Sequence, residues 1–153
     1  MTKLDAMDFR LLRQLQADPD LKCAELAQKS GMSPATCWRR LENMKRDGPI
    51  SRFEGSIDWT SLGYEIEVSL RIKLDKANPK VFDEFFYEVR KIPEVTEIQT
   101  FLGRVDVRLT LLARNSKHYR ELYRDRILAL PFVSDIEPLM LISTVKDSRC
   151  LPI

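Results

Sequence analysis

Residues 23–52 read CAELAQKSGMSPATCWRRLENMKRDGPISR, which is two short helical patterns joined by a tight turn. The hydroxyl of Ser33 can accept a hydrogen bond from a free amide in the first turn of the second helix. Pro34 fits the first helical position, where a backbone N–H has no partner inside the helix. Gly48 and Pro49 then predict the end of this helix. This layout is typical of a helix-turn-helix, whose second helix enters the major groove of DNA.

The second helix is predicted to have one apolar and one polar face. At 100° per residue, Cys37, Leu41 and Met44 share a face that should pack inward. Arginine and asparagine on the other face are residue types that bind guanine and adenine edges. We expect base contacts from Thr36, Arg39, Asn43 and Arg40. We expect phosphate contacts from Lys45, Arg46 and Arg52, and we include Ser33 among the DNA-binding residues. A solvated charged helix face is the alternative interpretation.

Composition and charge exclude several classes of protein. The formal net charge of +2 is too small to imply nucleic-acid binding by itself, so the argument for DNA is local. No apolar run approaches the roughly 20 residues of a membrane span, and we expect a cytoplasmic, nucleoid-associated protein. Three scattered cysteines and one histidine, His118, do not have the spacing of a metal site. With no phosphate loop and no nucleophile motif, we expect no cofactor and no enzymatic activity.

The hydrophobic period changes near residue 60, which predicts a domain of residues 1–60 and another of residues 61–153. The first holds a helix at about 5–16, the two helices of the helix-turn-helix and a small two-stranded wing within 50–57. The second begins with strict alternation over 65–74. It continues with a helix at 79–91, strands at 95–102 and 107–113, a helix from Ser116 and an extended stretch at 132–144 with a bulge at Pro138.

An internal similarity supports this order. IPEVTEI at 92–98 matches LPFVSDI at 130–136, and each segment follows a helix and opens a strand. The two βαβ halves predict an α+β protein in which a winged helix-turn-helix precedes a βαββαβ ferredoxin-like sandwich. Two helices would cover one face of the sheet, and we expect the open face or an edge to pair with a second subunit.

The ordered motifs resemble the Lrp/AsnC (feast/famine) family of prokaryotic transcription regulators. The segments that carry this resemblance span almost the whole chain: 4–12, 25–27, 31–34, 37–41, 48–50 and 103–107, with Lys146 and 151–153. The resemblance implies a sequence-specific DNA-binding regulator that forms dimers, and often tetramers or octamers, through its C-terminal domain. It also implies an amino-acid effector at the interface between these domains.

Carried over by position, the effector site would include Gly103, Arg104 and Asp106. Turn amides can bind an α-carboxylate, and an acidic group can bind an α-ammonium. The alternative is that Gly103 only makes the hairpin and Asp106 caps it. Leu102 and Val105 stand where the family often has threonine and an aromatic residue, and Pro49 stands where it usually has valine.

Two other functions are compatible with this architecture. One is an enzyme similar to the siroheme decarboxylases, against which the single histidine argues. The other is a sensing or scaffolding protein whose helix-turn-helix contacts protein. Trp38 could stack on a sugar or pack beneath the wing, and we expect packing.

Overall fold

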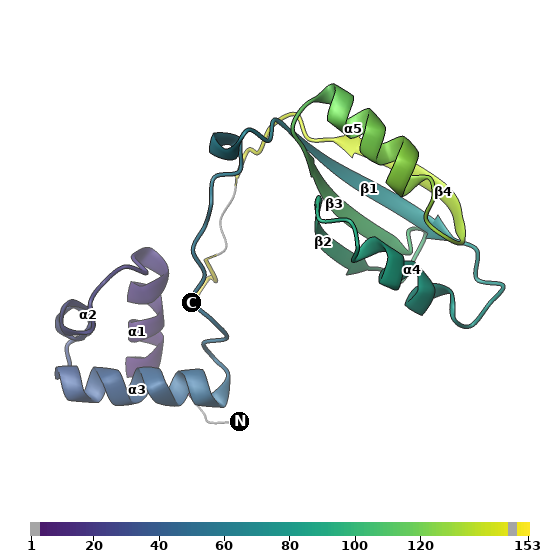
Figure 1. Ribbon diagram of the computed structural model, residues 1–153. Helices are drawn as coiled ribbons and strands as arrows, with labels where there is room; N and C mark the ends of the chain where they lie inside the picture. The colour runs from purple at the N-terminus through teal and green to yellow at the C-terminus, as the bar shows by residue number, and fades with distance from the viewer. Residues whose placement is uncertain (1–3, 147–149) are drawn as a thin grey trace. The chain divides into compact units, whose positions relative to one another are not determined.

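The structure is a computed structural model that describes residues 4–146 and 150–153 (Figure 1). Its contacts divide the chain into two units. Residues up to Ser56 group with the C-terminal segment from Lys146, and Ile57–Val145 form the second unit. The sequence-based division into 1–60 and 61–153 stays a prediction. The C-terminal segment lies on the first helix, where Arg13 Nε donates to the Ile153 carbonyl oxygen at 2.8 Å.

The N-terminal unit contains three helices: α1 (Ala6–Ala17), α2 (Cys23–Ser30) and α3 (Pro34–Asp47). Asp5 caps α1 by accepting from the amides of Met7 and Asp8, and Asp8 accepts from the Asp5 amide at 3.0 Å. This reciprocal arrangement is a capping box. Gly31 ends α2 with φ of 70°, a left-handed conformation that favours glycine. The buried core of the unit is Leu11, Leu26, Ala27, Cys37, Leu41 and Met44.

The predicted two-stranded wing is wrong in its strands. Gly48 ends α3, and the Ile50 amide donates to the Met44 carbonyl at 3.1 Å, so the chain leaves the helix as expected. Residues 51–57 then contain no strand. Phe53 and Ile57 are exposed, so this segment buries no apolar face that would hold two strands in register.

The second unit is the predicted βαββαβ fold. A short 3₁₀ turn, η1 (Thr60–Leu62), precedes it in the chain. Its elements are β1 (Ile66–Leu74), α4 (Val81–Val89), β2 (Val95–Thr100), β3 (Val107–Ala113), α5 (Ser116–Leu122), a π-helical continuation η2 (Tyr123–Ile127), and β4 (Val133–Met140). All paired strands are antiparallel, in the order β2-β3-β1-β4. The α+β fold class is therefore confirmed.

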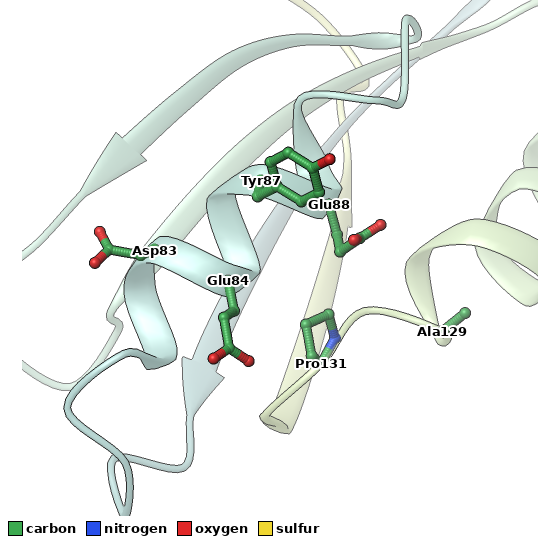
Figure 2. Close-up of a pocket in the computed structure, with 6 residues that line it drawn as sticks. All are labelled: Asp83, Glu84, Tyr87, Glu88, Ala129 and Pro131. Carbon is green, nitrogen blue, oxygen red and sulfur yellow. The ribbon is translucent and has the colours of Figure 1, made fainter.

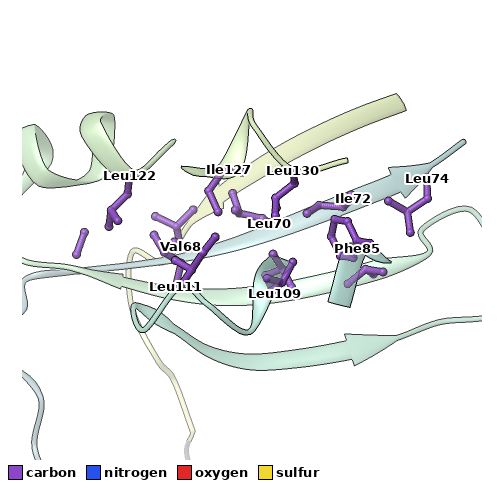
Figure 3. Close-up of a cluster of buried hydrophobic side chains, with 14 of the residues drawn as sticks. Val68, Leu70, Ile72, Leu74, Phe85, Leu109, Leu111, Leu122, Ile127 and Leu130 are labelled. Atoms are coloured by element: carbon purple, nitrogen blue, oxygen red, sulfur yellow. The ribbon is translucent and has the colours of Figure 1, made fainter. Parts of the chain in front are cut away.

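The helices cover one face of this sheet, as Figure 1 shows. Alternate residues of β1 and β3 are buried beneath them, because side chains in a strand point to opposite faces in turn. Figure 3 shows Phe85 of α4 and Ile127 of η2 reaching this core, in which Leu70 and Leu109 are fully buried.

The open face is polar in the middle and carries three leucines at one end, on either side of Glu67 and Ser69. Arg71 of β1 pairs with Glu137 of β4 at 3.4 Å. At the end, Leu112 lies opposite Glu67, Leu139 lies opposite Ser69, and the Leu141 amide donates to the Glu67 carbonyl. These three leucines therefore share one end of the open face.

The last strand differs from its prediction in two respects. It ends at Met140 instead of Thr144, and its irregularity lies opposite Lys73 and Leu74 instead of at Pro138. Pro138 stays in register with Leu70 on an edge strand. A proline is tolerated there because the missing N–H can face away from the neighbouring strand.

Candidate DNA interface and effector site

The two faces of α3 are arranged as the sequence predicts. Cys37, Leu41 and Met44 are buried against α1 and α2, whereas Arg39 and Arg46 are exposed. Burial raises the pKa of the Cys37 thiol to about 11, with a further contribution from the Cys23 thiol beside it. Cys37 is therefore a protonated core residue at neutral pH.

Ser33 acts first on its own helix. Its Oγ accepts from the Thr36 amide at 3.3 Å and donates to Thr36 Oγ1 at 2.9 Å. The N-cap prediction is confirmed. These bonds hold the first turn of α3, whose remaining free amides point out of the N-terminus.

Arg40 faces the protein in this structure, although we expected it at the DNA. Its Nη1 lies 2.6 Å from Asp8 Oδ1 and 2.9 Å from Asp5 Oδ2, so it links α3 to the capping box of α1. The hydrogen bond to Asp8, followed by the one to Asp5, raises the pKa of Arg40. Periodicity placed Arg40 at the edge of the polar face and could not show that the Asp5 and Asp8 carboxylates lie against that edge. Asn43 is half-buried beside this group and lines a cavity of about 220 Å³ with Arg40 and Asp8.

The three predicted phosphate contacts each have a carboxylate neighbour close in sequence. Lys45 pairs with Glu42 at 2.9 Å, Arg46 with Asp47 at 2.9 Å, and Arg52 with Glu54 at 2.6 Å. The pKa of Arg46 is raised by its hydrogen bond to Asp47. Exposed ion pairs contribute little free energy, so a phosphate can displace these carboxylates.

Trp38 does not pack beneath a wing. Its side chain is 58% exposed, and Phe53, in the segment after α3, is 54% exposed. The ammonium of Lys45 lies 5.7 Å from the Trp38 ring centroid and 5.5 Å from that of Phe53. An exposed pair of aromatic rings therefore flanks one lysine beside the recognition helix.

Asp106 is buried and already bound within the protein. Only 3% of the residue is exposed; Oδ1 lies 2.6 Å from Lys76 Nζ, and Oδ2 accepts from the Leu74 amide at 3.0 Å. Burial by itself raises the pKa of Asp106. The hydrogen bonds from Lys76 and Leu74 and the charges of Lys76 and Lys73 outweigh it, so the pKa lies below its ordinary value. Its carboxylate holds the turn after β2 to the end of β1.

Gly103 and Arg104 lie in that turn and are exposed, unlike Asp106. Leu102, the residue before them, is fully exposed as well. The structure thus brings Gly103 and Arg104 together at the turn and directs the Asp106 carboxylate towards β1. No ion pair of Arg104 is found within residues 4–146 and 150–153.

The second unit also contains a groove that the sequence pattern does not indicate. Figure 2 shows it between α4 and the segment that follows η2. It has a volume of about 500 Å³ and is lined by Asp83, Glu84, Tyr87, Glu88, Ala129 and Pro131. Glu88 pairs with Lys91 at 2.7 Å, and the same ammonium lies 4.0 Å from the Tyr87 ring centroid. The spacing of the acidic residues on α4 was visible in the sequence. The opposite wall, Ala129 and Pro131, lies 41 or more residues after Glu88, so the sequence pattern could not bring the two walls together.

His118 has a structural place at the start of α5. Its amide donates to Asn115 Oδ1 at 3.0 Å, and its Nδ1 accepts from the Arg114 amide at 3.1 Å. In the described part of the chain, no three histidine, cysteine or acidic side chains are grouped as metal ligands would be. The helices described there are all too short or too polar to cross a membrane.

A three-helix unit with a capped, basic outward helix, joined to a separate α+β sheet unit, defines a DNA-binding protein with a second, distinct domain. Family models agree: "Winged helix-turn-helix DNA-binding" matches residues 4–50, and "Lrp/AsnC ligand binding domain" matches residues 67–151. The chain belongs to the Lrp/AsnC family and is a DNA-binding transcription regulator.

Relatives match over nearly the whole chain. Transcriptional regulator AzlB of Bacillus subtilis is 31% identical over 98% of this chain and 96% of its own length. The leucine-responsive regulatory protein of Escherichia coli is 30% identical over 98% and 92%. These named relatives are regulators, which gives no support to the enzyme alternative.

Solved structures show the same fold. A transcriptional regulator from Neisseria meningitidis, solved in complex with L-Met, is 25% identical, with a TM-score of 0.91 and coverage of 98% of this chain and 97% of its own. An AsnC family regulator from Agrobacterium tumefaciens is 29% identical, with a TM-score of 0.86 and 97% coverage of both chains.

Proposed function

We propose that this regulator binds a specific duplex site in the cytoplasm as a homodimer, with Arg39 as its principal base-reading side chain. The observation that carries this proposal is the contrast between two neighbouring arginines. Arg40 is held by Asp8 and Asp5, whereas Arg39 is exposed on the outward face of α3 and has no ion pair within the described residues. A free guanidinium can donate two parallel hydrogen bonds to a guanine edge.

The other polar residues of the interface support Arg39. Ser33 and Thr36 hold the N-terminal turn of α3, and Asn43 lies at the side of the outward face. Lys45, Arg46 and Arg52 would bind phosphates after leaving their carboxylate partners. Arg40 does not belong to the proposed base-reading set, because Asp8 and Asp5 hold its guanidinium.

The test is to select bound duplexes from a random pool and then compare Arg39→Ala with Arg39→Lys. We expect Arg39→Ala to lose roughly 1–3 kcal/mol on the selected site. Arg39→Lys keeps the charge but not the paired donors, so it should bind random duplex like the wild type and still lose affinity for the selected site. Equal losses by Arg39→Ala on both duplexes would show that Arg39 contacts only phosphate.

The homodimer is proposed to form at the apolar end of the open face. Leu112, Leu139 and Leu141 lie on that face, and the chain continues with Ile142 and Val145, which are almost fully exposed. Leu139 lies on the edge strand β4 and Leu141 directly follows it, and exposed apolar side chains at a sheet edge are a typical site of subunit pairing. A twofold axis there would give the protein two recognition helices for half-sites about 34 Å apart. Assembly of such dimers into tetramers or octamers is part of the same proposal.

The effector is proposed to be an amino acid bound at the turn of Gly103 and Arg104, between two copies. Two comparisons support it: the second unit matches a ligand-binding family model, and the N. meningitidis relative was solved with L-Met. The exposed Arg104 can meet an α-carboxylate beside the turn amides. Asp106 would position this turn without touching the ligand, because both of its oxygens are occupied.

Calorimetric titration with a panel of amino acids tests the effector site. Arg104→Ala should abolish binding of whichever amino acid the wild type binds, while Arg90→Ala, at an exposed position after α4, should not change it. Unchanged binding by Arg104→Ala would place the effector elsewhere.

A further inference from the structure

We propose that Trp38, Phe53 and Lys45 form a stacking platform for the unpaired bases of single-stranded DNA. This goes beyond the recognition of a duplex site by α3. It assigns a ligand to the exposed aromatic rings beside the recognition helix, which duplex reading does not use.

The first observation is the shared contact of the two rings. Lys45 Nζ lies 5.7 Å from the centroid of Trp38 and 5.5 Å from that of Phe53, so both rings flank one ammonium group. Trp38 belongs to α3 and Phe53 to the segment after Gly48, and the lysine joins these two parts of the same unit.

The second observation is that both rings remain open to solvent. Trp38 is 58% exposed and Phe53 is 54% exposed, although aromatic side chains of this size are usually largely buried. Residues 51–57 form no strand that would cover them. The rings are therefore available to a flat, apolar ligand.

The third observation is the charge around the rings. Arg46 and Arg52 lie in the same stretch of chain, and each pairs with a carboxylate one or two residues away, Asp47 at 2.9 Å and Glu54 at 2.6 Å. Lys45 itself is held by Glu42 at 2.9 Å. A phosphate backbone can compete with these carboxylates for the three cations.

Aromatic rings set among cations are the features that proteins use to bind single strands without sequence preference. Bases in a duplex cover one another's faces, so a ring can stack only on a base that is unpaired. Lys45, Arg46 and Arg52 each pair with a carboxylate, and the phosphates of a nucleic acid can replace these partners whereas an apolar protein surface cannot.

The first test uses the full chain with Trp59→Phe, which leaves Trp38 as its one tryptophan. Its fluorescence is titrated with an oligothymidylate of about 12 nucleotides, within the range of known single-strand sites. The control is an abasic oligonucleotide of the same length and charge. We expect quenching by the oligothymidylate and little by the abasic strand. Equal quenching by both strands would mean that only the backbone is bound, and would overturn the proposal.

The second test measures anisotropy of labelled strands with Phe53→Ala and Phe53→Leu. Phe53 is exposed, so neither change removes a core residue. Loss of one stacked base corresponds to roughly a 5- to 150-fold weaker affinity for the oligothymidylate. Both variants should show this loss, because leucine is apolar but cannot stack, and should bind the abasic strand like the wild type. Wild-type affinity for the oligothymidylate in both variants would contradict the platform.

The same variants separate this proposal from the proposed function. Binding to the selected duplex is measured in parallel, and Arg39→Ala serves as the opposite control. We expect Arg39→Ala to lose the duplex site and keep the oligothymidylate. A loss of both ligands together in the Phe53 variants would show a defect of the whole unit and would also count against a separate platform.

Discussion

Asp106→Asn is the change that decides what this carboxylate does. The substitution keeps the size of the side chain and an oxygen that can still accept from the Leu74 amide at 3.0 Å. It removes the negative charge that faces Lys76 Nζ at 2.6 Å. Asp106 is buried while Lys76 is 58% exposed, so solvent partly screens the lost pair.

The expected cost follows from these contacts. A hydrogen bond to a charged group contributes about 1.5–3 kcal/mol, and the retained neutral bond contributes about 0.5–1.5 kcal/mol. We therefore expect Asp106→Asn to lower the free energy of unfolding by about 2 kcal/mol. For a domain of this size that corresponds to a fall in Tm of roughly 10 °C. Urea and thermal unfolding followed by circular dichroism measure both quantities.

The pH dependence of the free energy of unfolding tests the stabilising role of the Asp106 charge independently. Because the pKa of Asp106 is lowered in the folded protein, its stabilising contribution is present above the unfolded pKa of about 3.9 and is lost as pH falls through the folded pKa. The difference between wild type and Asp106→Asn should therefore be constant near neutral pH and shrink below about pH 4.

Asp135→Asn, at an exposed position on β4, is the matched control and should unfold like the wild type. An Asp106→Asn protein as stable as the wild type at pH 7 would show that the Asp106–Lys76 pair does not stabilise the fold. If that stable variant also lost amino-acid binding, Asp106 would instead be the ligand for the α-ammonium.

Three further changes test other parts of the molecule. Ser33→Ala removes the cap of α3 and should lower the free energy of unfolding by roughly 0.5–2 kcal/mol. Ser51→Ala, at an exposed position outside any helix, should leave the free energy of unfolding unchanged, and thermal melts compare the two variants. Leu141→Asp places a charge in the proposed dimer contact and should give monomers in sedimentation, and a persistent dimer would move the interface elsewhere. Arg46→Ala should weaken binding to selected and random duplexes equally and reduce the slope of log affinity against log salt by about 1, whereas a sequence-dependent loss would make Arg46 a base contact.

Residues that interact locally were predictable from the sequence. The cap at Ser33 and the end of α3 at Gly48 depend on atoms within four residues of one another. The alternation along β1 likewise depends only on the two-residue period of a strand. For these elements the structure confirms the prediction because neighbours along the chain supply the stabilising contacts.

Interactions between residues that lie far apart along the chain could not be predicted from the sequence. The two strands predicted for the wing do not form, because the apolar side chains of that segment stay exposed. The bulge lies at a different place from the predicted one, because the register of a strand is set by its pairing with the neighbouring strand. The acidic groove joins α4 to residues beyond η2, which no periodicity could connect.

Short-range periodicity and capping are enough to predict the helix-turn-helix, the βαββαβ order and the polar face of α3 from the order of residues alone. The pairing of Arg40 with Asp5 and Asp8 across 32–35 residues, and of Asp106 with Lys76 and β1, depends instead on how the chain folds, and Arg39 has no such partner among the described residues. The reason is physical: a charged side chain on a boundary of two faces binds whichever opposite charge packing brings within reach, and packing is a property of the whole chain.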